Sequence, residues 1–306
     1  MLCFSDTYDD IPQLSAIFDD VLTIHDFPQF TAKSWLFGRN IVEMCTAIKG
    51  AAAERIFEKY NPDILIYMDP DTKYFSYPVE LMRYLDYNDI ILTPHMCTPS
   101  SRERMNIELA CMRHGAYNLG FLALRNTANG RDFSRWWADR LVDYCLIDVQ
   151  RGIFTDQKLV DLAPCFFDRL HVMRETNYNL ATWNMEHRRL RRVDTEVFVD
   201  DRPLRFFHFA GSPGDRGLNN LINWFPAKAE IPLSLWDGYT DELNELMEDA
   251  YSRPWTYTAF SSGTKITDPM RKAYREKPAL KERFPDPFDS SGSDSFEAYW
   301  ASEESK

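Results

Sequence analysis

Two aspartates separated by one proline are the residues of this chain best suited to hold a metal ion. Asp69-Pro70-Asp71 comes at the end of a continuous apolar run over residues 63–69. Hard divalent cations prefer carboxylate oxygens and keep positions open for substrate phosphates. Two carboxylates on one turn can reach the same ion or its waters. The alternative is an ordinary turn, because Asp and Pro are common turn formers.

The apolar run before these aspartates predicts a strand buried on both faces, as in a mostly parallel sheet. Ligands of open α/β sheets collect at the carboxyl ends of strands, which is where the aspartates stand. Further strands are expected near residues 90–93 and 117–124, and helices over 34–60 and 132–144. Strands and helices alternate to about residue 174, which favours one large α/β domain.

The two ends of the chain have a different character. A strand, a helix and a strand are expected over residues 2–5, 9–18 and 21–24, and a hairpin joins 197–199 to 204–208. After residue 211 come loops, a short acidic helix over 240–251, and a tail rich in Ser, Asp and Glu from 286. We therefore divide the chain into a domain over 1–211, an extension over 212–285 that packs on it, and a flexible acidic tail or linker over 286–306.

Composition excludes several classes of protein. The formal net charge of −12 argues against nucleic acid as a partner, because binders of phosphate backbones need clustered Lys and Arg. The six cysteines are scattered without a CxxC pair, so neither a zinc knuckle nor a disulfide scaffold is indicated. No apolar run is long enough for a transmembrane segment. The expected location is the reducing cytoplasm, with a peripheral position at the inner membrane face as a variant of it.

Five motifs in order give the chain a family resemblance. They are YMDPDT at 67–72, TPH at 93–95, YNLGFLAL at 117–124, TDQ at 155–157 and FHFAG at 207–211. This order resembles bacterial GT-A glycosyltransferases of surface-polysaccharide biosynthesis and, more distantly, the glycogenin-like retaining transferases. The resemblance implies an α/β GT-A fold, which is Rossmann-like, with a mixed sheet flanked by helices and a helical or irregular C-terminal extension. The first strand and helix of that fold are expected to be missing, so no base-binding residue is assigned.

The resemblance also assigns the metal ligands and the residues beside the donor sugar. Asp69 and Asp71 become the DxD pair and His208 the third ligand of Mn²⁺ or Mg²⁺. A neutral imidazole can complete such a mixed oxygen and nitrogen site. The alternative for His208 is a histidine packed among phenylalanines. Asn118 and Gly120 match the motif beside the donor sugar, and their alternative is a turn and a bulge.

Four further residues are assigned by the same comparison. Asp156 and Gln157 match the acid and amide pair that flanks the reacting sugar, whereas a helix N-cap is the competing role for Asp156. Lys49 resembles the lysine that reaches toward the donor, with a solvated helix charge as its alternative. Gly211 would bring backbone N–H groups near the diphosphate. Where relatives carry a phosphate-binding lysine this chain has SPGD at 212–215, which leaves neutralisation to the metal, Lys49 and Arg205.

The implied activity is metal-dependent transfer of a sugar from a nucleotide-diphosphate sugar to a glycan or lipid-linked glycan, in polysaccharide biosynthesis. The glycogenin-like comparison implies that the anomeric configuration is retained, and relatives often carry further transferase modules. Two alternatives remain open. One is a nucleotidyltransferase or hydrolase with the same acidic strand end, although no Gly-rich basic phosphate loop is visible. The other is a degenerate, non-catalytic glycan-binding module.

Overall fold

A computed structural model describes residues 2–3, 6, 17–212, 214, 216–246 and 254–304. The chain folds into two compact units. The first combines residues 1–55, 134–147 and 253–306, and the second combines 56–133 and 148–252. Their boundaries fall within helices α2 (Ile41–Tyr60) and α5 (Ala128–Tyr144). The aspartate turn at residues 69–71 belongs to the second unit.

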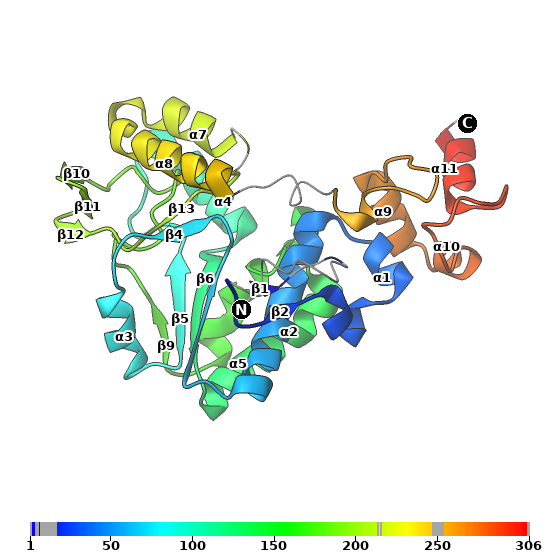
Figure 1. Ribbon diagram of the computed structural model, residues 1–306, viewed down its shortest axis with the longest axis horizontal. Coiled ribbons are helices and arrows are strands. Elements are labelled where there is room, and N and C mark those ends of the chain that lie inside the picture. The colour runs from blue at the N-terminus through cyan, green and yellow to red at the C-terminus, as the bar shows by residue number, and fades with distance from the viewer. Residues whose placement is uncertain are drawn as a thin grey trace. The chain divides into compact units, whose positions relative to one another are not determined.

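The second unit is built on a mixed four-stranded sheet in the order β3-β6-β5-β9 (Figure 1). Its strands are β3 (Ile64–Met68), β6 (Tyr117–Arg125), β5 (Ile90–Pro94) and β9 (Leu170–Val172). β6 is antiparallel to both β3 and β5, and only β5 and β9 are parallel. The expected mixed α/β architecture is therefore confirmed, whereas the mostly parallel sheet suggested by the apolar runs is wrong.

The antiparallel register decides which ends of the strands meet. Ile64 pairs with Arg125 and Met68 pairs with Phe121, so the end of β3 lies beside the beginning of β6. An apolar run carries no information on strand direction, which explains the error. The expected burial of this strand on both faces is also wrong, because β3 is an edge strand and its Ile66 is 40% exposed. The consequence of the register is that Asp69 and Asn118 come to the same end of the sheet.

One face of this sheet packs on α3 (Val79–Leu85). Their shared core is made of fully or nearly fully buried apolar side chains: Leu81, Leu85, Ile91, Phe121, Ala123, Met173, Tyr178 and Phe206. Burying each such side chain contributes about 1.5–3 kcal/mol relative to leaving it exposed. This core therefore holds the segment around Phe206 against the sheet.

The hairpin expected over 197–208 forms only in part. β11 (Glu196–Val199) pairs with β10 (Leu190–Val193) and with the short β12 (Arg202–Pro203). The following strand, β13 (Phe206–His208), leaves this sheet and pairs with β4 (Thr72–Tyr74). All three residues of β13 are buried, so burying them in the core of the unit outweighs continuing an exposed hairpin.

The rest of the second unit consists of short helices and strands around this frame. α7 (Arg216–Trp224) and α8 (Glu230–Leu246) lie side by side and share an apolar core with β13, with η7 (Pro226–Lys228) between them. α8 begins ten residues before the expected start at 240, and residues 247–251 of that expected helix lie outside the described part. The remaining elements are η4 (Arg102–Arg104), α4 (Met105–His114), β7 (Ile147–Asp148), η5 (Val149–Arg151), β8 (Ile153–Phe154), η6 (Lys158–Leu162) and α6 (Ala163–Phe166).

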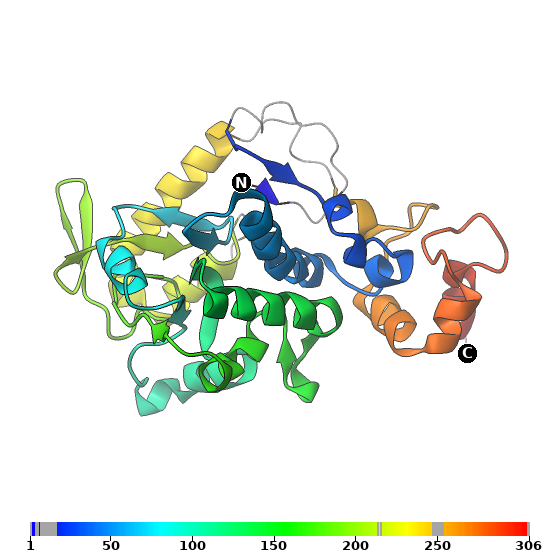
Figure 2. The same cartoon turned by 90° about the horizontal axis from the view of Figure 1, so that it is seen from below.

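The first unit contains the beginning and the end of the chain. β1 (Leu2–Cys3) and β2 (Val21–Leu22) pair in parallel, and most of the helix expected over 9–18 falls outside the described residues. The long helix expected over 34–60 is interrupted after α1 (Lys33–Phe37), and α2 and α5 lie side by side in Figure 2. In this unit the Oγ1 of Thr46 lies 3.1 Å from the Sγ of Cys145. Two short helices, η2 (Ile24–Asp26) and η3 (Pro28–Phe30), complete the N-terminal part.

An aromatic core organises the C-terminal part of the first unit. It lies among η9 (Thr256–Thr258), α9 (Asp268–Glu276), α10 (Pro278–Arg283) and α11 (Phe296–Glu304). The buried Phe37 and Phe296 meet there, with ring centroids 5.1 Å apart. The region expected to be a flexible tail from 286 thus includes a helix with a buried phenylalanine. None of the described helices is both long and apolar enough to span a bilayer.

Candidate metal centre

Three residues from two segments of the second unit meet at the end of β3. Asp69 and Asp71 stand on the turn between β3 and β4, and His208 is the last residue of β13. Because His208 pairs with Thr72 in the β13–β4 register, its ring lies next to the aspartate turn. The Nε2 of His208 is 3.1 Å from the Oδ1 of Asp71. One ligand atom from each of the three residues lies within 4.8 Å of the others, and in the described ranges no other group of His, Cys, Asp or Glu does so.

Backbone hydrogen bonds fix this turn on both sides. The amide of Asp69 donates to the carbonyl of Gly120 over 2.9 Å, and the amide of Phe209 donates to the carbonyl of Asp71 over 2.7 Å. The hydroxyl of Thr72 donates to the carbonyl of Asp69 over 2.7 Å, which closes the turn from inside. Tyr67 adds a side-chain contact, since its hydroxyl donates to the Oδ1 of Asp69. The carboxylates are thus held by three strands rather than by a loose loop.

The protonation of His208 follows from a chain of hydrogen bonds that begins at a backbone carbonyl. The hydroxyl of Thr93 donates to the carbonyl of Asn118 and accepts from the Nδ2 of Asn179, at 3.2 and 3.3 Å. The same Nδ2 donates to the Oδ1 of Asn118 over 3.1 Å. A carbonyl oxygen only accepts, so the Nδ1 of His208, 3.2 Å from that Oδ1, must carry the ring proton.

This tautomer leaves the Nε2 of His208 with a lone pair that faces the Oδ1 of Asp71. Two acceptors 3.1 Å apart repel each other unless a second ring proton or a cation lies between them. Asp69 adds a third acceptor to the same group. Two carboxylates and an oriented imidazole form a donor set suited to Mn²⁺ or Mg²⁺, and the hydrogen bond from Nδ1 to Asn118 is the outer contact that metal-binding histidines usually make. The residues present therefore fit a divalent cation.

Gly120 makes room for the imidazole. A Cβ at this position would lie 2.4 Å from the Cε1 and 2.8 Å from the Nδ1 of His208, closer than any van der Waals contact. The motif suggested that Gly120 lets the backbone approach a ligand, and here its immediate neighbour is the metal-facing histidine. Trp183 closes another side, with its ring edge-on to His208 at a centroid distance of 5.3 Å. His208 as a whole residue is 4% exposed, so the imidazole is enclosed by these neighbours.

Tyr239 of α8 covers the proline of the aspartate turn. Its ring stacks on Phe209 at 4.1 Å, and its hydroxyl donates to the carbonyl of Pro70 over 3.3 Å. Burial raises the pKa of Tyr239, and the charge of Asp71 raises it further. The phenol therefore stays neutral at physiological pH and acts as a hydrogen-bond donor.

Asp156 and Gln157 lie on a buried turn before η6. Thr155 has a left-handed backbone with φ of 45°, and the side chain of Gln157 donates to the carbonyl of His114 over 2.9 Å. The residue that precedes η6 is Gln157, and no side chain caps it, which excludes the N-cap alternative for Asp156. The assignment of both residues to the reacting sugar stays a prediction.

The remaining assigned residues have other surroundings. Lys49 belongs to α2 in the first unit and is only 5% exposed, which excludes a solvated helix charge, but its contact with a donor stays a prediction. Gly211 has φ of 91° in the turn where the amide of Ser212 bonds back to Phe209. Arg205 makes two 2.9 Å hydrogen bonds to the carboxylate of Glu80 and so anchors the chain before β13.

Sequence reasoning missed the polar residues that orient the histidine. Thr93 lies within the TPH motif at 93–95 but received no role, and Asn179 lies outside the five motifs. Both are buried, and Asn179 has a left-handed φ of 48°, a conformation that asparagine tolerates better than most residues. Trp183 and Tyr67 carried no signal beyond their aromatic character. The sequence offered one sign of the residues that orient His208, which was a polar residue at the end of a buried strand, such as Thr93.

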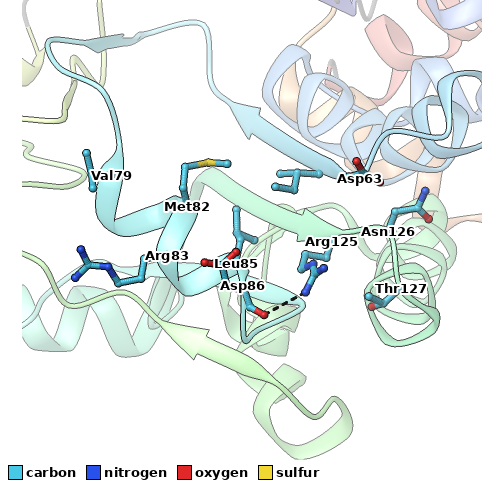
Figure 3. A pocket seen from close by; sticks show the side chains of 10 residues that line it. Asp63, Val79, Met82, Arg83, Leu85, Asp86, Arg125, Asn126 and Thr127 are labelled. Atoms are coloured by element: carbon cyan, nitrogen blue, oxygen red, sulfur yellow. Dashed lines mark hydrogen bonds between the residues drawn. The ribbon is translucent and has the colours of Figure 1, made fainter.

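A hollow of about 630 Å³ lies at the other end of the β3–β6 pair (Figure 3). Apolar side chains of β3 and α3 line it together with Asp63, Arg83, Asp86 and Arg125. Arg125 donates to the carbonyl of Asp86 over 3.3 Å. Since Ile64 and Arg125 pair at that end while the aspartates follow Met68, this hollow is separate from the candidate metal centre.

Comparison with known proteins gives distant matches. No protein-family model matches the sequence. Over 176 residues the chain is 27% identical to Uncharacterized protein YfnD and 24% identical to Uncharacterized protein YfnF, both of Bacillus subtilis (strain 168). Each alignment covers 56% of this chain, with 55% of YfnD and 58% of YfnF. The chain thus spans a little over half the length of these relatives.

A solved structure is also similar at a low level. It is the apo form of mouse Xyloside xylosyltransferase 1, with a TM-score of 0.32 and 16% sequence identity, over 64% of this chain and 77% of that one. A TM-score this low says nothing about what the chain does. The class that fold and site define is a mixed α/β protein with a candidate site for a divalent metal.

Proposed function

We propose that the chain is a metal-dependent glycosyltransferase that moves a sugar from a nucleotide-diphosphate donor to a glycan or lipid-linked glycan. The observation that carries the proposal is the 3.1 Å approach of the Nε2 of His208 to the Oδ1 of Asp71, beside Asp69. A Mn²⁺ or Mg²⁺ ion held there would supply Lewis-acid stabilisation of the negative charge on the leaving diphosphate. The order of the five sequence motifs supports this use of the site over other metal chemistry.

The protein's own part in such a reaction is to hold the ligands in place. Asn118 keeps the proton on Nδ1 of His208, so that Nε2 remains available as a ligand. Tyr67 holds one oxygen of Asp69 by a hydrogen bond, which leaves its other oxygen for a ligand role. Asp71 is the more solvent-accessible partner, with a side chain 26% exposed against 5% for His208. A diphosphate would therefore approach from the side of Asp71.

Metal binding can be tested without turnover. Titration of Mn²⁺ followed by electron paramagnetic resonance should show one tight site in the wild type that is lost in Asp71→Ala and His208→Ala. Asp63→Ala serves as the matched control, because Asp63 is an exposed aspartate at the other end of β3. Retained Mn²⁺ binding in Asp71→Ala and His208→Ala would overturn the proposed site.

Product analysis separates the proposed activity from the alternatives. A glycosyltransferase releases a nucleoside diphosphate from its donor, whereas a nucleotidyltransferase releases pyrophosphate. A non-catalytic glycan-binding module releases neither. Incubation of a panel of nucleotide sugars with Mn²⁺ and glycan acceptors, followed by chromatography, tests for release of nucleoside diphosphate. Incubation of nucleoside triphosphates with sugar 1-phosphates and Mn²⁺ tests for release of pyrophosphate, and the absence of both products favours the binding module.

A further inference from the structure

Three buried polar atoms without partners gather beside the candidate metal centre. They are the Nε1 of Trp183, the Nδ1 of His95 and the Oδ1 of Asn179, none of which has a hydrogen-bond partner within the described part of the chain. Native proteins leave few such atoms unsatisfied, because each costs about 1–3 kcal/mol. Of the twelve such atoms among the described residues, these three belong to neighbouring side chains, which points to a site that a ligand completes.

The three residues belong to one connected cluster of the second unit. The ring of Trp183 lies edge-on between two imidazoles, with centroids 5.6 Å from His95 and 5.3 Å from His208. Asn184, the next residue, donates to the carbonyl of Asn179 over 2.8 Å and to that of His95 over 3.4 Å. The segment 179–184 is thus tied to the end of β5, and Asn179 is one hydrogen bond away from the partner of His208.

The polarity of the three atoms limits what they can bind. The Nε1–H of Trp183 is a donor, and the Oδ1 of Asn179 is an acceptor. Burial lowers the pKa of His95 to about 4, so the ring is neutral at pH 7. Its hydrogen bonds to the backbone of Gly115 and Ala116 raise that pKa, as carbonyl acceptors do, which places the ring proton on Nε2 and makes Nδ1 an acceptor.

One donor and two acceptors suit hydroxyl groups rather than phosphate. A hydroxyl both donates and accepts, so it can satisfy any of the three atoms, whereas phosphate oxygens would be repelled by the two acceptors. Trp183 is half-buried, and the accessible part of its indole offers an apolar surface for the C–H groups of a sugar ring. The cluster therefore has the chemistry of a carbohydrate subsite.

We propose that Trp183, His95 and Asn179 bind the hydroxyls of the transferred sugar, next to the metal-bound diphosphate. This inference rests on the proposed function and deepens it, because it assigns the residues that select the sugar. Trp183 and His95 are binding residues in this scheme and take no part in metal coordination.

The test compares affinities for nucleotide sugars and for the matching diphosphates. Isothermal titration with Mn²⁺ and a panel of UDP-, GDP-, ADP- and dTDP-hexoses, with UDP, GDP, ADP and dTDP as references, identifies the pair in which the sugar adds most affinity. For that pair Trp183→Phe, which removes the Nε1–H and shortens the ring system but keeps an aromatic side chain, should weaken nucleotide-sugar binding by about tenfold, the loss of one hydrogen bond. Binding of the diphosphate should stay unchanged. His95→Gln, which removes Nδ1, should behave alike.

Trp35→Phe is the matched control. The Nε1 of Trp35 donates to the carbonyl of Val142 over 2.7 Å in the first unit, so its loss should lower the melting temperature and leave both affinities unchanged. Trp183→Phe breaks no hydrogen bond of the described residues, so its melting temperature should fall less than that of Trp35→Phe. Equal losses for nucleotide sugar and diphosphate, or wild-type affinity in both Trp183→Phe and His95→Gln, would overturn the subsite.

The two proposals fail in different ways. Wild-type protein that binds no diphosphate in the presence of Mn²⁺ contradicts the proposed function. Wild-type protein that binds diphosphate but gains nothing from any sugar in the panel contradicts the subsite alone. A crystal structure with a sugar hydroxyl on Trp183 Nε1 would support it, and ordered water on all three atoms beside a bound nucleotide sugar would count against it.

Discussion

Replacement of Asn118 by alanine is the sharpest test of how the candidate metal ligands are oriented. Asn118 is 8% exposed, and its Oδ1 accepts from His208 at 3.2 Å and from Asn179 at 3.1 Å. Without this acceptor, the ring proton of His208 can move to Nε2, where it is attracted by Asp71. The nitrogen that faces the metal position then carries a proton and no longer serves as a ligand.

The expected size of the effect follows from the role of such outer contacts. Loss of a hydrogen bond that orients a metal-binding histidine typically lowers metal affinity about 10–100-fold, or about 1.4–2.8 kcal/mol. Asn118→Ala also removes one of the two partners of the Nδ2 of Asn179, which should lower the free energy of unfolding by about 1–3 kcal/mol. Mn²⁺ titration measures the first effect, and chemical denaturation without metal measures the second.

Asn118→Asp is the matched variant. A carboxylate at this position keeps an acceptor for the Nδ1–H of His208 and increases the basicity of the ring, so Mn²⁺ affinity should be retained or raised. Wild-type Mn²⁺ affinity in a folded Asn118→Ala variant would refute the tautomer argument. A tenfold loss in both variants would show that the size of the side chain, rather than its acceptor, matters.

Three further outcomes are expected. Gly120→Ala places a Cβ 2.4 Å from the Cε1 of His208, so it should abolish Mn²⁺ binding and destabilise the fold by about 1–3 kcal/mol. The control is Gly238→Ala in α8, where a Cβ has no neighbour within 4 Å. In denaturation experiments this variant should be more stable by up to about 1 kcal/mol. Burial alone would raise the pKa of Glu80, but hydrogen bonds from Arg205, from its own backbone and from Tyr178 lower it overall. The stability that this carboxylate contributes is therefore present above pH 4.5 and lost below it. Glu80→Gln should flatten that part of a pH–stability curve. The pKa of His95 is lowered by burial to about 4, so the unfolded chain binds the proton first. Stability should therefore fall by about 2–3 kcal/mol as pH drops from 6.5 toward 4, and by less in His95→Gln.

Each of these outcomes has a result that would contradict it. Unchanged Mn²⁺ affinity in Gly120→Ala would mean that the imidazole has another place to go. Identical acid limbs for wild type and Glu80→Gln would mean that the carboxylate is equally paired in the unfolded chain. A flat stability curve between pH 6.5 and 4 would mean that His95 titrates as it does in water.

The positions of the strands and of the turn that carries the aspartates were predictable because both follow from local composition. Periodicity and apolar runs gave β3, β5, β6 and α5 to within a few residues. Strand direction and strand partners depend on contacts far apart in the chain, which is why a mostly parallel sheet and a longer hairpin were expected in their place. The partner of β13 is β4, and no local signal in residues 206–208 names it.

The candidate site was predictable only as far as its motifs reached. The positions of Asp69, Asp71 and His208 came from the order of motifs, and the structure brings them together. The residues that orient His208 could not be predicted, because Thr93, Asn118 and Asn179 act through a chain of contacts that exists only after three strand ends meet. The sequence also does not show whether Lys49 lies near the end of the sheet that carries Asp69 and Asp71.

The two-stranded pairing of β4 with β13 has a consequence for how an ion would enter and leave. This short sheet joins residue 72 to residue 208, and it is separate from the four-stranded sheet. Opening it would part His208 from the aspartates while the larger sheet stays intact. Exchange of the backbone amides of His208 and Phe209, which bond to Leu180 and Asp71, should therefore slow when Mn²⁺ is added. A bound ion would thus stabilise the pairing of β13 with β4.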